Sequence, residues 1–329
     1  MYSAKWRSLR TLAKGHTIRN SILLFMTACI WGLAFVSQSK GMESMGPFTF
    51  NGVRSLLGAA AVLPLVLMQI HREKREGKIA ETDRSGKPAG GIKGIKFILA
   101  GGLFCGLAFT AGTTLQQIGI IYTTVGKAGF ITTLYIIFVP ILGIFLKKKV
   151  SYVVWIGAVM AAVGLYLLCM EEKFSLKPGD TLIMLCALVF SLHIMIIDHF
   201  TPKVAGVYLS CIQLFVCGVV SLIFALLLEA PSLLQLKEGL GSLLYAGIMS
   251  CGVGYTLQIV GQKGMHPAIA SLILSMESVV ATVSAFFAYK LGFLKTDQSM
   301  TGRQIAGCAI VLAAVLLVQM PVKHREKSE

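Results

Sequence analysis

Ten long apolar segments constrain this chain more than any other feature. Each holds about 20 mostly apolar residues, the length that an α-helix needs to cross the hydrocarbon core of a bilayer. The segments cover residues 21–37, 47–70, 95–118, 124–146, 152–170, 180–199, 204–228, 240–262, 267–289 and 303–320. With 55% hydrophobic and 14% charged residues, the chain cannot cover a soluble globule with polar surface. The sequence therefore predicts an all-α membrane protein with ten transmembrane helices and no soluble catalytic domain.

The positive charges indicate how the chain is oriented in the membrane. If the N-terminus is cytoplasmic, 21 of the 30 lysines and arginines fall in segments that face the cytoplasm. These segments include residues 1–20, the loop around 71–94 and the tail 321–329. Because such charges concentrate on the cytoplasmic side, we expect a multi-pass protein of the cell membrane with both termini in the cytoplasm. The net charge of +15 then reflects topology rather than nucleic-acid binding.

Other interpretations of the composition have less support. The basic N-terminus followed by residues 21–37 resembles a signal peptide, but no small-residue cleavage site follows it. The eight cysteines form no CxxC or CxxH pattern, which favours helix packing over a metal site or disulfide framework. No Walker motif, dinucleotide fingerprint or nucleophile–base set is present. We therefore expect no cofactor, no metal site and no enzymatic activity.

The second half of the chain repeats the first. The first two segments align with the sixth and seventh at an offset of 159 residues, the third and fourth with the eighth and ninth at 142, and the fifth with the tenth at 150. Each unit holds five predicted helices, an odd number, so the second unit enters the membrane in the opposite direction. We predict an inverted five-plus-five repeat with units over residues 21–170 and 178–320. This architecture suits alternating access to a central site.

One polar motif occurs in both units. "GTTLQQIG" covers residues 112–119 and "GYTLQIVG" covers residues 254–261, with five of eight positions identical. Because the units are inverted, we expect Gln116 near the outer end of the third helix and Gln258 near the inner end of the eighth. Glycines also permit close helix packing, and a glutamine can hydrogen-bond a neighbouring helix. Lining of a transport pathway and helix packing are therefore both open interpretations.

Glu277 places a carboxylate near the centre of the ninth segment. A charge at mid-bilayer costs roughly 2.5–3.5 kcal/mol on insertion scales, so it needs a functional or structural reason. Its helix face carries small residues, which predicts that it points away from lipid, and its repeat partner is Tyr135. We expect Glu277 to bind a proton or a cationic group.

Arg54 lies about two turns inside the second segment, at a depth within about 5 Å of Glu277. Its face also carries Asn51 and Gly58. The functional interpretations are that Arg54 neutralises Glu277 or binds an anion. A fixed structural ion pair and an arginine that snorkels outward are the alternatives.

Aromatic and polar residues near mid-depth complete the set of candidates. Trp31 and its repeat partner Phe190 are interpreted as walls of a cavity, although lipid-facing or core packing explains them equally well. His193 is interpreted as a proton relay. Gln213 is the residue of the second unit that corresponds to Arg54. The candidate substrate or coupling residues are Glu277, Arg54, Trp31, Tyr135, His193, Gln116, Gln258 and Gln213.

Two stretches resemble the drug/metabolite transporter superfamily, EamA type. "ACIWGLAFVSQSKGMESMGPFTFNGVR" resembles the first-helix signature, and "ASLILSMESVVATVSAFF" resembles the ninth-helix pattern. The resemblance covers about residues 20–320. It implies a ten-helix carrier with a central cavity lined by helices 1–4 and 6–9, and similar residues at the positions of Trp31, Arg54 and Glu277.

The chain departs from that family pattern at two places. The family often ends its fourth and ninth helices with "LGE", where this chain has lysines at 147–149 and "YKL" at 289–291. Ser278 stands where the family often has proline after the glutamate, so a proline kink is not expected there.

These features together predict a secondary transporter that works by alternating access in a lipid bilayer. Family members commonly export amino acids, metabolites or drugs, often in exchange for protons, so a small-molecule substrate and proton coupling through Glu277 are expected. A homodimer is left open. One alternative is an uncoupled facilitator or flippase for a lipid-linked or nucleotide-linked substrate, which would favour Arg54 over Glu277. An intramembrane enzyme is a further alternative, but the cluster of catalytic groups that it needs is not seen.

Overall fold

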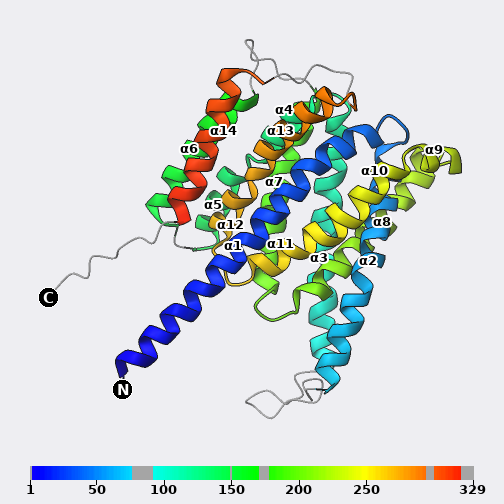
Figure 1. The fold of residues 1–329 in the computed structure, drawn as a ribbon. Helices are drawn as coiled ribbons and strands as arrows, with labels where there is room; N and C mark the ends of the chain where they lie inside the picture. The colour runs from blue at the N-terminus through cyan, green and yellow to red at the C-terminus, as the bar shows by residue number, and fades with distance from the viewer. Residues whose placement is uncertain (1, 76–91, 149, 170–177, 294–299, 320–329) are drawn as a thin grey trace.

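The computed structural model describes residues 2–75, 92–148, 150–169, 178–293 and 300–319. Within these ranges every regular element is a helix (Figure 1). Nine of the described helical segments are long and apolar enough to cross a membrane, and a tenth, over Tyr152–Leu167, is shorter. The predicted all-helical membrane fold is therefore confirmed. Residues 76–91 of the predicted basic loop, Lys295 and the predicted tail 321–329 lie outside the described residues.

The first unit contains α1 (Tyr2–Gly41), α2 (Pro47–Arg75), α3 (Ile92–Ile120), α4 (Val125–Thr132), α5 (Tyr135–Phe145) and α6 (Tyr152–Cys169). The second contains α7 (Pro178–Phe200), α8 (Gly206–Leu228), α9 (Leu233–Glu238), α10 (Leu240–Leu244), a π-helix η1 (Tyr245–Gly254), α11 (Tyr255–Gln262), α12 (Pro267–Leu274), α13 (Met276–Lys290) and α14 (Gly302–Gln319). Three of the spans are composite: α4 with α5, α10 with η1 and α11, and α12 with α13.

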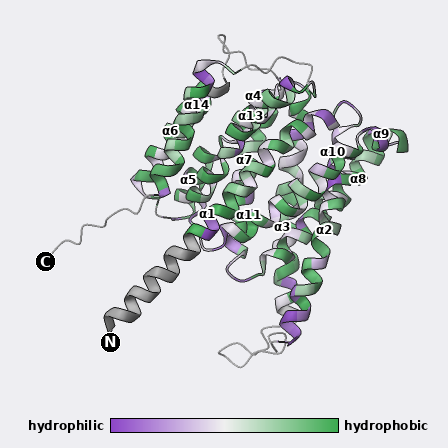
Figure 2. Cartoon of the chain, in the orientation of Figure 1, coloured by the Kyte–Doolittle hydropathy of each residue, from purple (hydrophilic) through white to green (hydrophobic). Residues whose placement is uncertain are grey.

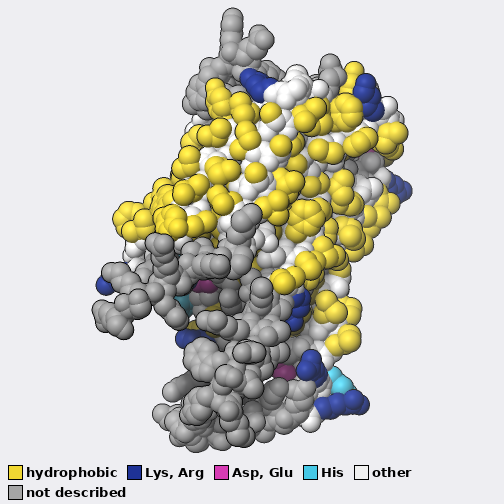
Figure 3. All heavy atoms as spheres, turned by 60° about the vertical axis from the view of Figure 1, so that its left-hand side comes forward, with side chains coloured by type: hydrophobic (Ala, Val, Ile, Leu, Met, Phe, Trp, Pro, Cys, Tyr) yellow, Lys and Arg dark blue, Asp and Glu magenta, His cyan; other side chains and the backbone are white. Residues whose placement is uncertain are grey.

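The outside of the bundle is apolar over most of its height. Hydrophobic residues run along the middle of the helices, and hydrophilic residues gather towards their ends (Figure 2). On the face drawn in Figure 3, hydrophobic side chains form a broad surface, and lysines and arginines lie mainly near its margins. Leucines and phenylalanines such as Phe145 and Leu226 are largely exposed. Such a surface is stable against lipid rather than water.

The inverted repeat governs how the helices approach each other in the middle of the bundle. A Cβ atom at Gly112 on α3 would lie 2.8 Å from the ring of Phe190 on α7. A Cβ atom at Gly254, where η1 ends, would lie 2.7 Å from the indole of Trp31 on α1. Both partners of each contact are repeat-equivalent, so glycine admits an aromatic ring at the same place in both units.

The same correspondence holds at the two ends of the bundle. A Cβ atom at Gly119 would lie 3.0 Å from the carbonyl oxygen of Gly179, and one at Gly261 would lie 3.2 Å from that of Asn20. Asn20 also donates through Nδ2 to the carbonyl oxygen of Lys263, at 2.8 Å. The two copies of the repeated motif therefore both pack a glycine against the beginning of the apolar part of a helix from the other unit.

Two spans are interrupted at repeat-equivalent residues, Thr133 and Ser275. The hydroxyl of Thr133 donates to the carbonyl oxygen of Phe130 at 2.8 Å, and that of Ser275 donates to that of Leu272 at 2.7 Å. Side-chain bonds of this kind compete with the helical backbone bonds and bend helices. The second interruption occurs without the proline of the family pattern, and it precedes Glu277 by two residues.

Candidate functional site

A cavity lies between the two units at the centre of the bundle. It contains about 480 Å³ of space between atoms, of which only about 30 Å³ is wide enough for the centres of water molecules. In this conformation it therefore holds little more than one or two waters. Seven of the eight candidate residues line it: Trp31, Arg54, Gln116, Tyr135, His193, Gln258 and Glu277.

Most of the lining consists of repeat-equivalent pairs. The pairs are Trp31 with Phe190, Phe35 with Ile194, Gln116 with Gln258, Thr132 with Leu274, and Tyr135 with Glu277. Residues that correspond in an inverted repeat face each other only around the pseudo-twofold axis. The cavity is thus built on the axis that relates the two units.

Glu277 is held at this axis by its own repeat partner. The hydroxyl of Tyr135 donates to Oε1 of Glu277 at 3.1 Å, and both side chains are buried. Glu277 lies in the first turn of α13, where the positive end of the helix dipole favours a carboxylate. Among the described residues, no lysine, arginine or histidine forms an ion pair with it.

Arg54 lines the same cavity without pairing with Glu277. Its side chain on α2 is 3% exposed, so it does not snorkel outward. The guanidinium lies over the ring of Phe50, 5.2 Å from the centroid, and its Nε has no hydrogen-bond partner. The interpretation of a fixed structural ion pair is therefore wrong for this conformation.

His193 is positioned by Gln213, the one candidate residue that does not line the cavity. Nε2 of His193 lies 2.9 Å from Oε1 of Gln213, so the histidine donates this bond when Nε2 carries the proton. Both side chains are buried, and the ring of His193 lies 5.8 Å from that of Phe109 and 6.4 Å from that of Tyr255, between centroids. Gln213 therefore lies behind the wall that His193 forms.

Trp31 belongs to an aromatic wall that the sequence predicted only in part. Its indole Nε1 donates to the carbonyl oxygen of Ser250 at 3.4 Å, and its ring lies 4.5 Å from that of Tyr255. Tyr255 also packs edge-on against Phe109 at 4.4 Å. Tyr255 was missed, although it stands inside the second copy of the repeated motif, where the first copy has Thr113.

The two motif glutamines meet the cavity from opposite units. Nε2 of Gln116 donates to Oγ1 of Thr132 at 3.1 Å, whereas Oε1 of Gln258 is buried without a partner. We expected them near opposite ends of the pathway, and both line one cavity. The adjacent Gln117 donates to the carbonyl oxygen of Gln38 at 3.3 Å and so joins α3 to α1.

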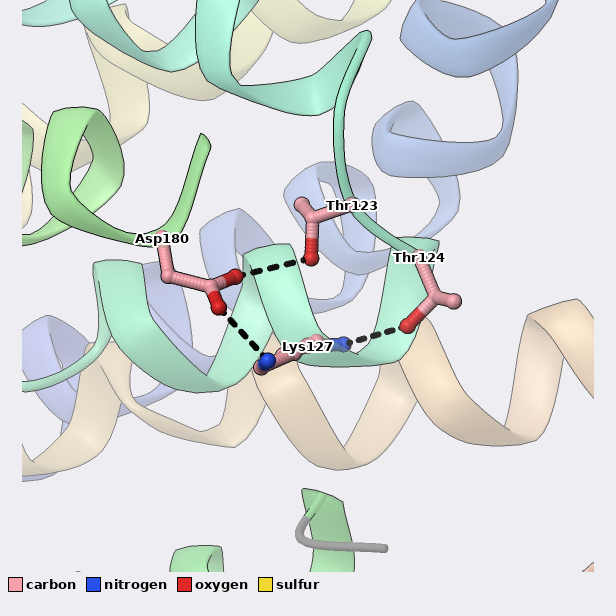
Figure 4. A network of polar contacts seen from close by, with 4 residues as sticks. All are labelled: Thr123, Thr124, Lys127 and Asp180. Carbon is pink, nitrogen blue, oxygen red and sulfur yellow. Dashed lines mark hydrogen bonds and ion pairs between the residues drawn. The ribbon is translucent and has the colours of Figure 1, made fainter. Parts of the chain in front are cut away.

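An ion pair that the sequence did not predict joins α4 to the first turn of α7 (Figure 4). Oδ2 of Asp180 on α7 lies 2.6 Å from Nζ of Lys127 on α4, and Oδ1 accepts a bond of 3.0 Å from Thr123. The backbone N–H of Lys127 in turn donates to Thr124, the N-cap of α4, at 3.3 Å. At the other end of α7, Asp198 forms an ion pair with Lys148.

The described residues contain no group of three or more histidine, cysteine or acidic side chains that could hold a metal ion. The chemistry available to the cavity is that of one carboxyl group, one guanidinium, one imidazole, amides and aromatic rings. The carboxyl group and the imidazole can bind and release protons, and the guanidinium and the amides can bind polar ligands.

Comparison with known proteins identifies the architecture. A model of the EamA-like transporter family matches residues 19–170 and 177–320, so its two matches coincide with the two units. A protein of Archaeoglobus fulgidus named as an uncharacterized transporter is 28% identical over 91% of this chain and 85% of its own length. Protein PecM of Dickeya dadantii is 24% identical over 90% of both chains.

Other matches agree in fold and extent. The uncharacterized transporter YoaV of Bacillus subtilis is 23% identical over 90% of this chain and 95% of its own. A crystal structure that is 17% identical superposes with a TM-score of 0.66 over 91% of this chain and 97% of the other. The chain belongs to the EamA-like transporter family, a family of multi-pass membrane transporters.

Proposed function

We propose that this protein is a secondary transporter that exports small metabolites by alternating access, with proton movement coupled through Glu277. The central observation in support is a cavity shared by the two inverted units that contains one buried carboxyl group. We also propose the orientation expected from the basic segments, with both termini in the cytoplasm. The substrate class, the direction and the coupling ion belong to this proposal.

The paired contacts at the two ends of the bundle support alternating access. Gly119 packs against Gly179 at one end, and Gly261 packs against Asn20 at the other. If the two units exchange conformations, each of these equivalent contacts takes the arrangement of the other, so the two ends can open in turn while the cavity stays on the axis. The small volume of the cavity fits a conformation closed around the site.

The environment of Glu277 supports a proton-carrying role. A carboxylate without a cationic partner is costly to bury, and protonation removes that charge. Deprotonation then requires water, a substrate cation, or a shift of Arg54 or His193, which line the same cavity. A carboxyl group that reaches each side of the membrane in turn binds a proton on one side and releases it on the other.

The test begins with purified protein and a panel of metabolites, because ligands that bind the folded protein raise its melting temperature. Ligands found in this way are then loaded into proteoliposomes, and flux is measured with and without a pH gradient. We expect Glu277→Gln to lose gradient-driven flux while ligand binding persists. Glu43→Gln, an exposed glutamate paired with Lys40, is the matched control and should transport normally.

The outcomes separate the parts of the proposal. Full gradient-driven flux in Glu277→Gln would refute the role of this carboxyl group. Wild-type flux that ignores the pH gradient would favour the uncoupled facilitator instead. Absence of flux for every ligand that binds would contradict transport itself.

A further inference from the structure

Arg54 is a buried cation with unused hydrogen-bonding capacity. A guanidinium carries five N–H donors, and the described residues give it no acidic partner. The guanidinium carbon lies over the ring of Phe50, 5.2 Å from its centroid, and Nε is buried without an acceptor. Because Arg54 lines the central cavity, a ligand in that cavity is placed to accept these donors.

Asn51 adds a second polar group on the same side of α2. It precedes Arg54 by three residues, which places both side chains on one helix face. Asn51 is fully buried, and neither its amide oxygen nor its amide nitrogen has a partner. Buried polar groups are almost always hydrogen-bonded in native proteins, so two neighbouring exceptions on one face indicate a missing partner.

The equivalent place in the other unit carries no cation, although Nε2 of Gln213 there is also buried without a partner. Gln213 on α8 corresponds to Arg54, carries no charge, and uses its oxygen to bond His193 at 2.9 Å. The cation therefore belongs to one side of the axis only. A ligand bound here is oriented, with its negative end towards α2.

The other lining residues indicate which groups the rest of the ligand carries. Trp31, Tyr255 and Phe190 present aromatic surface to it. A guanidinium binds carboxylate and phosphate groups through paired N–H donors, which gives it specificity for planar or tetrahedral oxyanions.

We propose that Arg54, supported by Asn51, is an oxyanion subsite, and that the transported molecules are small amphipathic anions with a carboxylate or phosphate group and an apolar body. This inference rests on the proposed function, because it takes the central cavity as the substrate site. Binding of the anion neutralises the one unpaired cation of the cavity, and its apolar body packs against the aromatic wall.

The first experiment measures binding to the purified full-length protein in detergent. Phenylacetate and phenyl phosphate are compared with phenylacetamide and phenol, within a wider panel of carboxylates and phosphate monoesters paired with their amides and alcohols. We expect acids, but not their uncharged counterparts, to raise the melting temperature of the wild type. Arg54→Gln should weaken acid binding at least tenfold, and the carboxylate and phosphate arms identify which oxyanion is preferred.

The second experiment needs no ligand and uses the repeat partner as its control. Arg54→Met removes a buried cation that has no acidic partner among the described residues, so the melting temperature of the unliganded protein should stay the same or rise. Gln213→Met should lower it, because His193 loses its hydrogen-bond partner. A drop in Arg54→Met as large as that in Gln213→Met would identify a structural role and overturn the proposal. So would a panel in which no acid stabilises the wild type more than its uncharged counterpart.

These results are independent of proton coupling. Binding is measured in detergent without a pH gradient, so the preference for acids is measured separately from coupled flux. If gradient-driven flux fails but acid binding depends on Arg54, only the coupling mechanism is lost. If uncharged ligands bind and are transported equally well, transport stands and the oxyanion subsite is refuted.

Discussion

In the first unit α3 is a regular α-helix from Ile92 to Ile120, whereas the equivalent span of the second unit becomes a π-helix over Tyr245–Gly254. Within that π-helix the carbonyl oxygen of Ser250 accepts the indole N–H of Trp31. The repeat partner of Trp31 is Phe190, which has no N–H to satisfy, and it packs against the regular helix. π-Helices occur frequently at functional sites, and this one borders the central cavity.

The two units are thus alike where they pack and different where they face the cavity. Glycines at equivalent positions meet equivalent helices at both ends of the bundle. In the cavity, Tyr135 faces Glu277 and the counterpart of Arg54 is Gln213. Packing by glycine depends on backbone geometry that both copies share, while recognition and coupling require particular charges on one side of the axis.

The largest effect is expected from removing the polar groups of the two residues that meet on the axis, Tyr135 and Glu277. The double variant Y135F/E277Q removes the carboxyl group and should reduce gradient-driven flux at least about 100-fold, the scale of losing a proton-transfer group. The exchange variant Y135E/E277Y restores both groups in mirrored positions, so it should recover most of that flux. Flux in proteoliposomes measures both.

If the exchange variant binds ligand but transports no better than Y135F/E277Q, the two sides of the axis are not equivalent for coupling. That result would locate the asymmetry in the surroundings of Glu277, including Arg54, rather than in the carboxyl group alone.

The next effect concerns the ion pair between Lys127 and Asp180. Lys127→Met should destabilise the protein by about 3 kcal/mol, because it removes a cation that lies 2.6 Å from a fully buried carboxylate. Asp180→Asn leaves only a partly exposed lysine and should cost less. Thermal unfolding in detergent measures both.

The double variant K127M/D180N is the control, because it removes both charges together. It should be more stable than Lys127→Met alone. An equal loss in all three variants would mean that packing, not charge, matters at this end.

A smaller effect should distinguish the two motif glycines. Gly119→Ala brings a methyl group into Ile183 and to 3.0 Å from a carbonyl oxygen, whereas at Gly261 the nearest atoms lie at 3.0 to 3.2 Å. We expect a loss of about 1–3 kcal/mol for Gly119→Ala, in the range of overpacked cores, and less for Gly261→Ala. Equal melting temperatures for the two variants would show that both ends pack with the same tolerance.

The smallest effect is expected from Trp31→Phe, which makes the two repeat partners identical. The indole N–H bond to Ser250 is long, so its loss should cost about 1 kcal/mol or less. Phe190→Leu controls for lost ring area in the other unit. A loss of several kcal/mol in Trp31→Phe, measured by thermal unfolding, would show that the π-helix depends on this bond.

Much of the architecture could be predicted from local pattern. Hydropathy predicted the spans because their length is set by the bilayer, and the offsets between segments predicted the repeat. The offset of 142 residues identified Tyr135 as the repeat partner of Glu277, but it did not predict the hydrogen bond between them. The separation of Arg54 from Glu277, the ring contacts of Tyr255 and the ion pair of Lys127 could not be predicted in this way.

The sequence by itself determined which segments enter the membrane, that the second unit is inverted, and which polar residues lie within the bundle, because length, hydropathy and periodicity are local properties of the chain. Only the tertiary structure decided that Arg54 stays apart from Glu277, that Lys127 meets Asp180, and that Tyr255 joins Trp31. Each of those outcomes depends on the rotation and spacing of helices from distant parts of the chain, and differences of a few ångströms decide whether two charges pair.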